Sequence, residues 1–188
     1  MRENLYFIAI LPPPEISSGI ISIQNDLSER FETKKALKVM PHITLKAPFK
    51  VGENQHENVL RWFTSMAVNV TPFIIELKDF GSFPNPKSPV IYIKPVRNLS
   101  LLALQKEILP QFQAAFPSQT VSNLELSFKP HMTVAYRDLH PDMFKKAWPE
   151  FSLKKYSVQF EVIDFQLLQH NGKEWNVVRT FNLSGSLF

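Results

Sequence analysis

The 188-residue chain contains no cysteine, which excludes disulfide bonds, thiolate metal sites and cysteine nucleophiles. This absence is compatible with a reducing compartment, and we expect a cytoplasmic protein. Only five glycines are present, and they are scattered, so the chain lacks the glycine-rich loop that cradles the phosphates of ATP or GTP. No glycine-rich turn for a nucleophilic serine or threonine is present either. The sequence therefore disfavours an ATP-dependent ligase and a serine hydrolase.

Long apolar runs are also absent. The apolar run at residues 5–11 is seven residues long, ends at three prolines and lacks the cleavage site of a signal peptide. We interpret it as a first strand. No apolar run approaches the ~20 residues that cross a bilayer, so we predict no membrane partner. The net charge of +4 mildly favours anionic ligands, without the dense Lys/Arg run of a nucleic-acid-binding tail.

Against these absences, one five-residue pattern occurs twice. Pro-His-Ile-Thr-Leu contains His42 and Thr44, and Pro-His-Met-Thr-Val contains His131 and Thr133, with the two histidines 89 residues apart. Alternate side chains of a strand share a face, so each His and its Thr would point the same way. The apolar residues beside them would point into a core. A fold that brings the two strands together would place two imidazoles and two hydroxyls around one cleft.

The order of secondary-structure elements repeats along with the motif. Apolar spacing and turn signals predict strand, helix, His-Thr strand, helix and strand in each half of the chain. The expected strands are 4–11, 37–45, 73–80, 90–96, 126–136, 156–170 and 174–183, and the expected helices are 12–31, 53–68, 99–116 and 141–148. Asn171-Gly172 predicts a hairpin between the last two strands.

This repetition predicts an α+β fold built as a duplicated bilobal unit. Mainly antiparallel sheets would line a central cleft, with the helices outside. We expect one bilobal domain over residues 1–188, with pseudo-repeats of about 1–84 and 88–188 joined by a proline-rich loop at 84–89. Because such a chain makes its own pseudo-symmetric cleft, we expect a monomer.

Two histidines in one cleft suit phosphodiester cleavage. The unperturbed imidazole pKa of about 6.5 lets one ring hold a proton while the other lacks one. A base takes a proton from the attacking oxygen, and an acid on the opposite side gives one to the departing oxygen. The hydroxyls of Thr44 and Thr133 could donate to phosphate oxygens. This scheme needs no cofactor, and no carboxylate lies at ligand spacing to complete a metal site with His42 and His131.

Neighbouring residues are candidate substrate contacts. Lys46 shares the face of Thr44 if the strand is regular, and it meets a phosphate there or is a solvated lysine at the strand end. Tyr136 and Arg137 follow the second motif and could stack on a base or bind phosphate, with a surface ion pair to Asp138 as the alternative for Arg137.

We expect the other three histidines to be structural or solvated. They are His56 at a polar helix start, His140 at a helix N-terminus, and His170 before the hairpin turn. Phe83 ends a strand, where a place in the core is favoured over one lining the cleft.

The paired motifs and the element order resemble the two-histidine phosphoesterase superfamily over nearly the whole chain. Its members include bacterial 2′-5′ RNA ligase-like proteins and cyclic nucleotide phosphodiesterases. The resemblance implies a bilobal duplicated α+β fold, His42 and His131 as the acid and base pair, and Thr44 and Thr133 as phosphate ligands. It implies metal-independent action on 2′,3′-cyclic phosphates, 2′-5′ linkages or RNA ends.

Three functions stay open at this point. The first is a metal-independent phosphodiesterase with a nucleotide or RNA substrate. The second is an RNA-binding protein without useful turnover, which the intact His and Thr of both motifs disfavour. The third is a 2′-5′ RNA ligase that runs the same chemistry in reverse.

Overall fold

The computed structural model describes residues 2–184 of the chain, an α+β fold with one large sheet. Its strands are β1 (Glu3–Ile10), β2 (Ile43–Gly52), β3 (Phe73–Phe83), β4 (Val90–Pro95), β5 (Met132–Ala135), β6 (Ser157–Val162), β7 (Asp164–His170) and β8 (Trp175–Asn182). Its helices are α1 (Pro14–Phe31), α2 (His56–Thr64), α3 (Leu99–Ala115), α4 (Asn123–Leu126) and α5 (Pro141–Leu153), with 3₁₀ turns η1 (Lys35–Lys38) and η2 (Glu53–Gln55).

The strands form a curved sheet in the order β6-β3-β4-β5-β2-β1-β7-β8, and each neighbouring pair within the described residues is antiparallel. The expected α+β class and antiparallel pairing are confirmed. The two halves of the sheet are continuous, because β2 and β5 pair at its centre through Ile43 and Met132. These are the residues between His and Thr in the two motifs, so the sheet itself joins the motifs.

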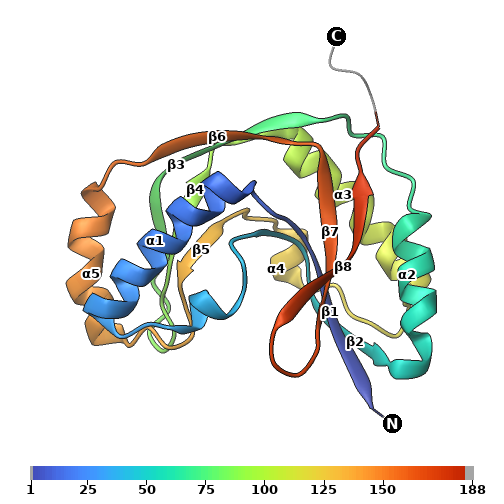
Figure 1. Cartoon of the computed structure of the whole chain (residues 1–188), viewed down its shortest axis with the longest axis horizontal. Helices are drawn as coiled ribbons and strands as arrows, with labels where there is room; N and C mark the ends of the chain where they lie inside the picture. The colour runs from blue at the N-terminus through green and yellow to red at the C-terminus, as the bar shows by residue number, and fades with distance from the viewer. Residues whose placement is uncertain (1, 185–188) are drawn as a thin grey trace.

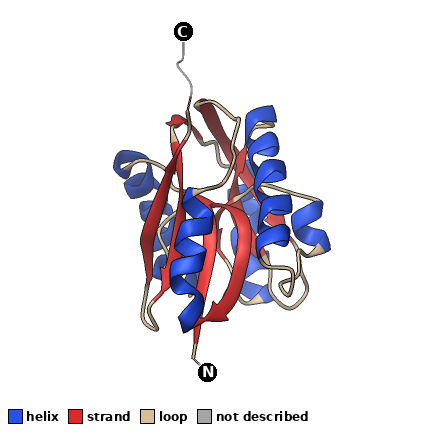
Figure 2. Cartoon of the chain, turned by 90° about the vertical axis from the view of Figure 1, so that its right-hand side faces the viewer, coloured by secondary structure: helices blue, strands red, loops and turns tan. Residues whose placement is uncertain are grey.

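The helices lie outside the sheet, and two of them pack on the opposite half of the sheet from the strands they follow. α1 follows β1 and packs on β5, whereas α3 follows β4 and packs on β2. In Figure 1, α1 and α5 lie at one side and α2 and α3 at the other. Figure 2, turned by 90°, shows the strands with helices around them. Within residues 2–184, no helix has the length and apolar character needed to cross a bilayer.

The helix starts have local causes in the sequence. Pro14 occupies the first turn of α1, where a missing N–H costs nothing. Asn98 caps α3 by accepting a hydrogen bond from the Leu101 amide at 2.9 Å. His140 precedes Pro141 and accepts from the Asp142 amide, so its predicted place at a helix N-terminus is confirmed.

Three predicted strands differ from the structure. Residues 37–42 are not strand, because η1 and a loop precede β2, which begins at Ile43. The second motif strand is the short β5, because α4 and a loop occupy residues 123–131. The predicted strand 156–170 is two strands separated at Ile163, and β6 and β7 lie in opposite halves of the sheet. Apolar alternation continues through the first two of these breaks, so it could not reveal them. At the third break the alternation changes phase between Val162 and Ile163, a signal that the predicted single strand overlooked.

β1 buries side chains on both of its faces. Tyr6, Ile8 and Ile10 lie in the main core under the helices. Phe7 and Ala9 point the other way into a small apolar cluster that also includes Leu168, Val39, Met40 and Trp175. The second cluster lies on the same face of the sheet as the motif side chains, so it forms part of the candidate site.

Candidate active site

A pocket of about 460 Å³ opens on the face of the sheet where the two motifs meet. Four of its lining side chains are His42, Thr44, His131 and Thr133. Ile43 and Met132 lie between them and are fully buried on the opposite face. The alternation predicted from the sequence therefore holds at both motifs, and the structure brings the two imidazoles and the two hydroxyls to one cavity.

Both histidine rings are held in the same way. The Nδ1 atom of His42 lies 2.8 Å from the carbonyl oxygen of Met40, and that of His131 lies 2.7 Å from the carbonyl oxygen of Lys129. A carbonyl oxygen only accepts, so each Nδ1 is the protonated nitrogen and donates to the residue two positions earlier. Each Nε2 is thereby left for a ligand, as a lone-pair base when the ring is neutral and as a donor when it is charged.

The surroundings of the two rings favour their neutral forms. Burial lowers the pKa of His42 to about 4, with a further decrease from the nearby His131, although the hydrogen bond to Met40 acts in the opposite direction. Burial also lowers the pKa of His131, against the hydrogen bond to Lys129. A positive charge on His131 would therefore further disfavour protonation of His42.

Gln24 supports the second motif from α1. Its side chain is 2% exposed, and its Nε2 donates to the backbone carbonyl of Thr133 at 3.2 Å. β2 and β5 pair only around Ile43 and Met132 and then separate, so this carbonyl meets a side chain instead of a strand. Gln24 also lines the pocket. No local sequence pattern indicates this role, because the partner of Gln24 lies 109 residues away.

Aromatic rings pack against both histidines. Phe7 packs against His42 with ring centroids 5.0 Å apart, and Trp175 meets Phe7 edge-on at 4.5 Å. Phe83 and Tyr92 pack against His131, with ring centroids 5.2 and 5.5 Å from the centroid of the imidazole. These rings supply the apolar surroundings that lower the pKa of both histidines. Phe83 is thus packed on a site residue and is only partly buried, unlike the core position expected for it.

The position of Tyr92 depends on a glycine. Gly81 on β3 pairs with Tyr92 on β4, and the Tyr92 ring lies across it. A β-carbon at position 81 would come within 2.6 Å of that ring. Glycine is therefore needed here for the close approach that places Tyr92 beside His131.

The strand after Thr44 is not regular, and this changes the place of Lys46. On β1, Ala9 pairs with Thr44 and Ile8 with Lys46, so Leu45 is an extra residue in a bulge. A bulge reverses the alternation of side chains that follows it. Lys46 consequently points away from the face of Thr44 and into the core.

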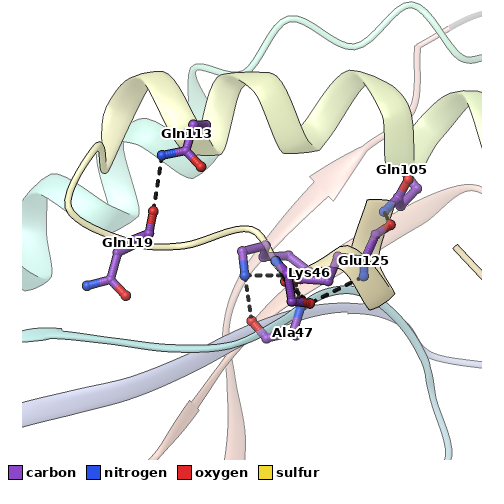
Figure 3. A network of polar contacts seen from close by, with 7 residues as sticks. Lys46, Ala47, Gln105, Gln113, Gln119 and Glu125 are labelled. Atoms are coloured by element: carbon purple, nitrogen blue, oxygen red, sulfur yellow. Dashed lines mark hydrogen bonds and ion pairs between the residues drawn. The ribbon is translucent and has the colours of Figure 1, made fainter. Parts of the chain in front are cut away.

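In the core, the Nζ atom of Lys46 lies 2.7 Å from Oε1 of Glu125 and 3.2 Å from the carbonyl oxygen of Ala47 (Figure 3). It also lies 4.5 Å from the ring centroid of Phe112. The side chain is 2% exposed and does not line the pocket. The structure thus contradicts both interpretations of Lys46, the phosphate contact and the solvated lysine. Both were wrong because no local sequence pattern indicates the bulge.

Tyr136 and Arg137 both line the pocket, as the sequence analysis expected of substrate contacts. Arg137 has a φ of 60°, a left-handed conformation that is uncommon outside glycine, and its guanidinium lies 5.2 Å from the Tyr136 ring. Asp138 accepts hydrogen bonds from the Thr33 hydroxyl and the amide of Lys34, so its carboxylate anchors the segment before η1. The alternative ion pair between Arg137 and Asp138 does not form among the described residues.

The hairpin of β7 and β8 contributes two residues that the sequence analysis did not assign to the site. His170 and Trp175 pair across the hairpin, have ring centroids 5.1 Å apart and line the pocket. Gly172 supplies the turn with a φ of 95°, which confirms the predicted hairpin. His170 was expected to be structural or solvated. Its place at the pocket follows from the pairing of β7 with β1, which no local pattern indicates.

The remaining predictions concern His56 and a metal site. His56 begins α2, and its Nδ1 lies 2.7 Å from the Tyr6 hydroxyl oxygen, a structural role as expected. In the part of the chain that the structure describes, no group of three or more His, Asp or Glu side chains is placed to hold a metal ion.

Comparison with known proteins identifies the family. The model of the 2′-5′ RNA ligase superfamily matches residues 12–174, a span that includes both motifs. The chain belongs to the 2′-5′ RNA ligase superfamily. The resemblance that the paired motifs suggested is therefore confirmed.

Relatives of this superfamily member are named as phosphoesterases. A protein of Bacillus cytotoxicus named "putative phosphoesterase" is 32% identical over 163 residues, covering 85% of this chain and 87% of that protein. One of Geobacillus kaustophilus with the same description is 30% identical over 181 residues, covering 96% of each. The chain is thus a phosphoesterase-like member of the superfamily.

Solved structures show the same fold. E. coli LigT in complex with 3′-AMP has a TM-score of 0.69 at 17% identity, covering 98% of this chain and all of LigT. The protein TT0787 of Thermus thermophilus has a TM-score of 0.66 at 19% identity, covering 97% of this chain and 99% of that protein. At these identities the likeness concerns the fold alone.

Proposed function

We propose that this protein is a metal-independent phosphodiesterase that opens 2′,3′-cyclic phosphates or cleaves 2′-5′ linkages of nucleotides or RNA ends. The observation that carries the proposal is the matched pair of histidines, each with Nδ1 fixed by a carbonyl and Nε2 left for a ligand in one pocket. This arrangement supplies an acid and a base without a metal ion.

We assign the role of the base to His42 because its ring stays neutral. With a pKa lowered to about 4, its ring is neutral throughout the physiological range and can take the proton of an attacking water. The oxygen of that water then forms the new bond to phosphorus. His131, protonated when the anionic substrate is bound, gives its proton to the departing ribose oxygen as that phosphorus–oxygen bond breaks. The two rings exchange protonation states, and a proton passes back through solvent before the next turnover.

Thr44, Thr133 and Arg137 are the residues that bind the phosphate group of the substrate in this proposal. Hydroxyl groups of Thr44 and Thr133 donate to the non-bridging oxygens, where negative charge increases in the transition state. Arg137 at the pocket edge supplies positive charge for the same group or for a neighbouring phosphate. Ring opening leaves a 2′- or 3′-monophosphate, the chemical class of the 3′-AMP bound in one LigT structure. That correspondence supports a nucleotide substrate.

A ligase activity uses the same residues in reverse. Water at its bulk concentration favours hydrolysis, so we propose hydrolysis as the net reaction. An RNA-binding protein without turnover is the third candidate, but binding alone does not require two rings with lowered pKa in contact with one cavity.

The test is a panel of the four 2′,3′-cyclic nucleotides and 2′-5′-linked dinucleotides incubated with the purified protein in EDTA. Monophosphate that forms in EDTA supports the proposal, and the position of its phosphate identifies the bond broken. If no panel member reacts while a ribonucleotide oligomer still binds, the RNA-binding candidate is favoured.

A further inference from the structure

The carboxylate of Glu125 connects the segments that carry the two motifs. Its Oε1 accepts hydrogen bonds from the Lys46 ammonium at 2.7 Å and the Ala47 amide at 3.0 Å (Figure 3). Its Oε2 accepts from the amide and the hydroxyl of Ser122, both at 2.9 Å. Lys46 and Ala47 directly follow the first motif, and Ser122 caps α4, which precedes the second motif.

In the segment that follows the first motif, Glu125 stabilises an irregular part of the pocket wall. The pairing of β1 with β2 passes from Lys46 to Phe49, so Ala47 and Pro48 have no partners on β1. Proline has no amide hydrogen, and the Ala47 amide bonds to Glu125 instead of a strand. Residues 44 and 48, on either side of this contact, both line the pocket. The carboxylate therefore holds the bulge in the shape that directs those two side chains to the ligand.

In the segment that precedes the second motif, Glu125 fixes the start of the loop that leads to His131. Its backbone carbonyl accepts from Gln105 of α3 at 2.8 Å, which ties α4 to a long helix. α4 ends at Leu126, and the following loop supplies the Lys129 carbonyl that orients the ring of His131. A shift of α4 would move that carbonyl.

The ion pair is buried, and each of its members has at least one further hydrogen bond. The side chains of Lys46 and Glu125 are 2% and 11% exposed. Burial alone would raise the pKa of Glu125, but the hydrogen bonds from Lys46, Ser122 and Ala47 outweigh it and lower that pKa. A buried pair of this kind contributes less to net stability than an apolar pair of the same volume, but it favours a single geometry.

We propose that Glu125 and Lys46 are positioning residues, which set the first motif and its bulge relative to the loop that carries His131. The kinetic part of this proposal rests on the proposed function. A spectroscopic measurement that needs no substrate tests it independently.

The experiment compares Glu125→Gln with the wild-type protein at a temperature at which circular dichroism shows both to be folded. We expect kcat for 2′,3′-cyclic nucleotides to fall by about 10- to 100-fold while KM changes by less than about 2-fold, because small displacements of reacting groups reduce the chemical step. Ser122→Ala, which removes one donor to the carboxylate, is the milder variant if Glu125→Gln does not fold, and should lower kcat by about 3-fold. Glu150→Gln, in an exposed ion pair with Arg30, is the control and should leave kcat unchanged.

The substrate-free measurement is the NMR signal of each histidine ring. Glu125→Gln should shift the ring signals of His42 and His131, whereas Glu150→Gln should shift neither. Wild-type kcat and unchanged ring signals in folded Glu125→Gln would overturn the positioning role. If the wild type turns over no cyclic nucleotide, the ring signals decide alone: shifted signals support the positioning role although the proposed function fails, and unchanged signals overturn it.

Discussion

Ile43 and Met132 are backbone partners, and this pair joins the two halves of the sheet. Each lies between the histidine and the threonine of its motif. Antiparallel pairing around this point places His42 on the side of Thr133 and Thr44 on the side of His131. The pocket is therefore a consequence of one strand register, and four predictions about its chemistry follow from the contacts around it.

The first prediction concerns the threonine hydroxyls. Thr44→Val and Thr133→Val keep the side-chain shape and remove the donor, so kcat for a cyclic nucleotide should fall by about 10- to 100-fold in each variant. Thr44→Ser and Thr133→Ser keep the hydroxyl and should retain most of the activity. Steady-state kinetics of the four variants provide the measurement. Valine variants as active as the serine variants would remove the threonines from the mechanism.

The second prediction is the pH dependence of kcat/KM. The base must be neutral, so activity should be lost as the pH falls through the His42 pKa of about 4. The acid must be protonated, so activity should be lost as the pH rises through the lowered pKa of His131. The profile should be bell-shaped, with its maximum between about pH 4 and pH 6.5. A maximum above pH 7 would contradict the assigned roles.

The third prediction links the same histidines to stability. Both have a lower pKa in the folded protein than the value of about 6.5 in the unfolded chain. Between those values the unfolded state binds more protons, so this stabilisation is present above pH 6.5 and is lost as the pH falls towards 4. In His42→Gln, the difference in free energy of unfolding between pH 7 and pH 5 should shrink by about 1–2 kcal/mol.

Urea unfolding at the two pH values measures this difference. His140→Asn, at an exposed helix cap, is the matched control and should retain the wild-type pH dependence. An identical pH dependence in His42→Gln and the wild type would show that burial does not affect the protonation of His42.

The fourth prediction separates two cations that look alike in the sequence. Arg137 lines the pocket, so Arg137→Ala should weaken binding of an RNA oligonucleotide and reduce the dependence of its affinity on salt. Lys46 is buried with Glu125, so Lys46→Met should leave the salt dependence unchanged and lower the free energy of unfolding by about 3 kcal/mol. Fluorescence anisotropy in a salt series and urea unfolding distinguish them. A reduced salt dependence in Lys46→Met would place Lys46 at the ligand.

The sequence predicted the parts of the site that depend on local periodicity. The alternation of His, apolar residue and Thr holds because Ile43 and Met132 are backbone partners and are both buried. Lys46 was misplaced because the bulge at Leu45 depends on the pairing with β1 and on Glu125, 79 residues away. Trp175 was not assigned to the site because it reaches the pocket through the pairing of β7 with β1. Contacts between distant segments leave no local pattern to detect.

The most direct test of the central claim is turnover of a 2′,3′-cyclic nucleotide in EDTA by His42→Ala, His131→Ala and the double variant. We expect each single variant to lose at least about 10²-fold in kcat, and the double variant to lose little more than either, because the two rings act in one step. Fluorescence anisotropy should show that all three still bind an RNA oligonucleotide. Wild-type kcat in either single variant would contradict two-histidine catalysis by this protein.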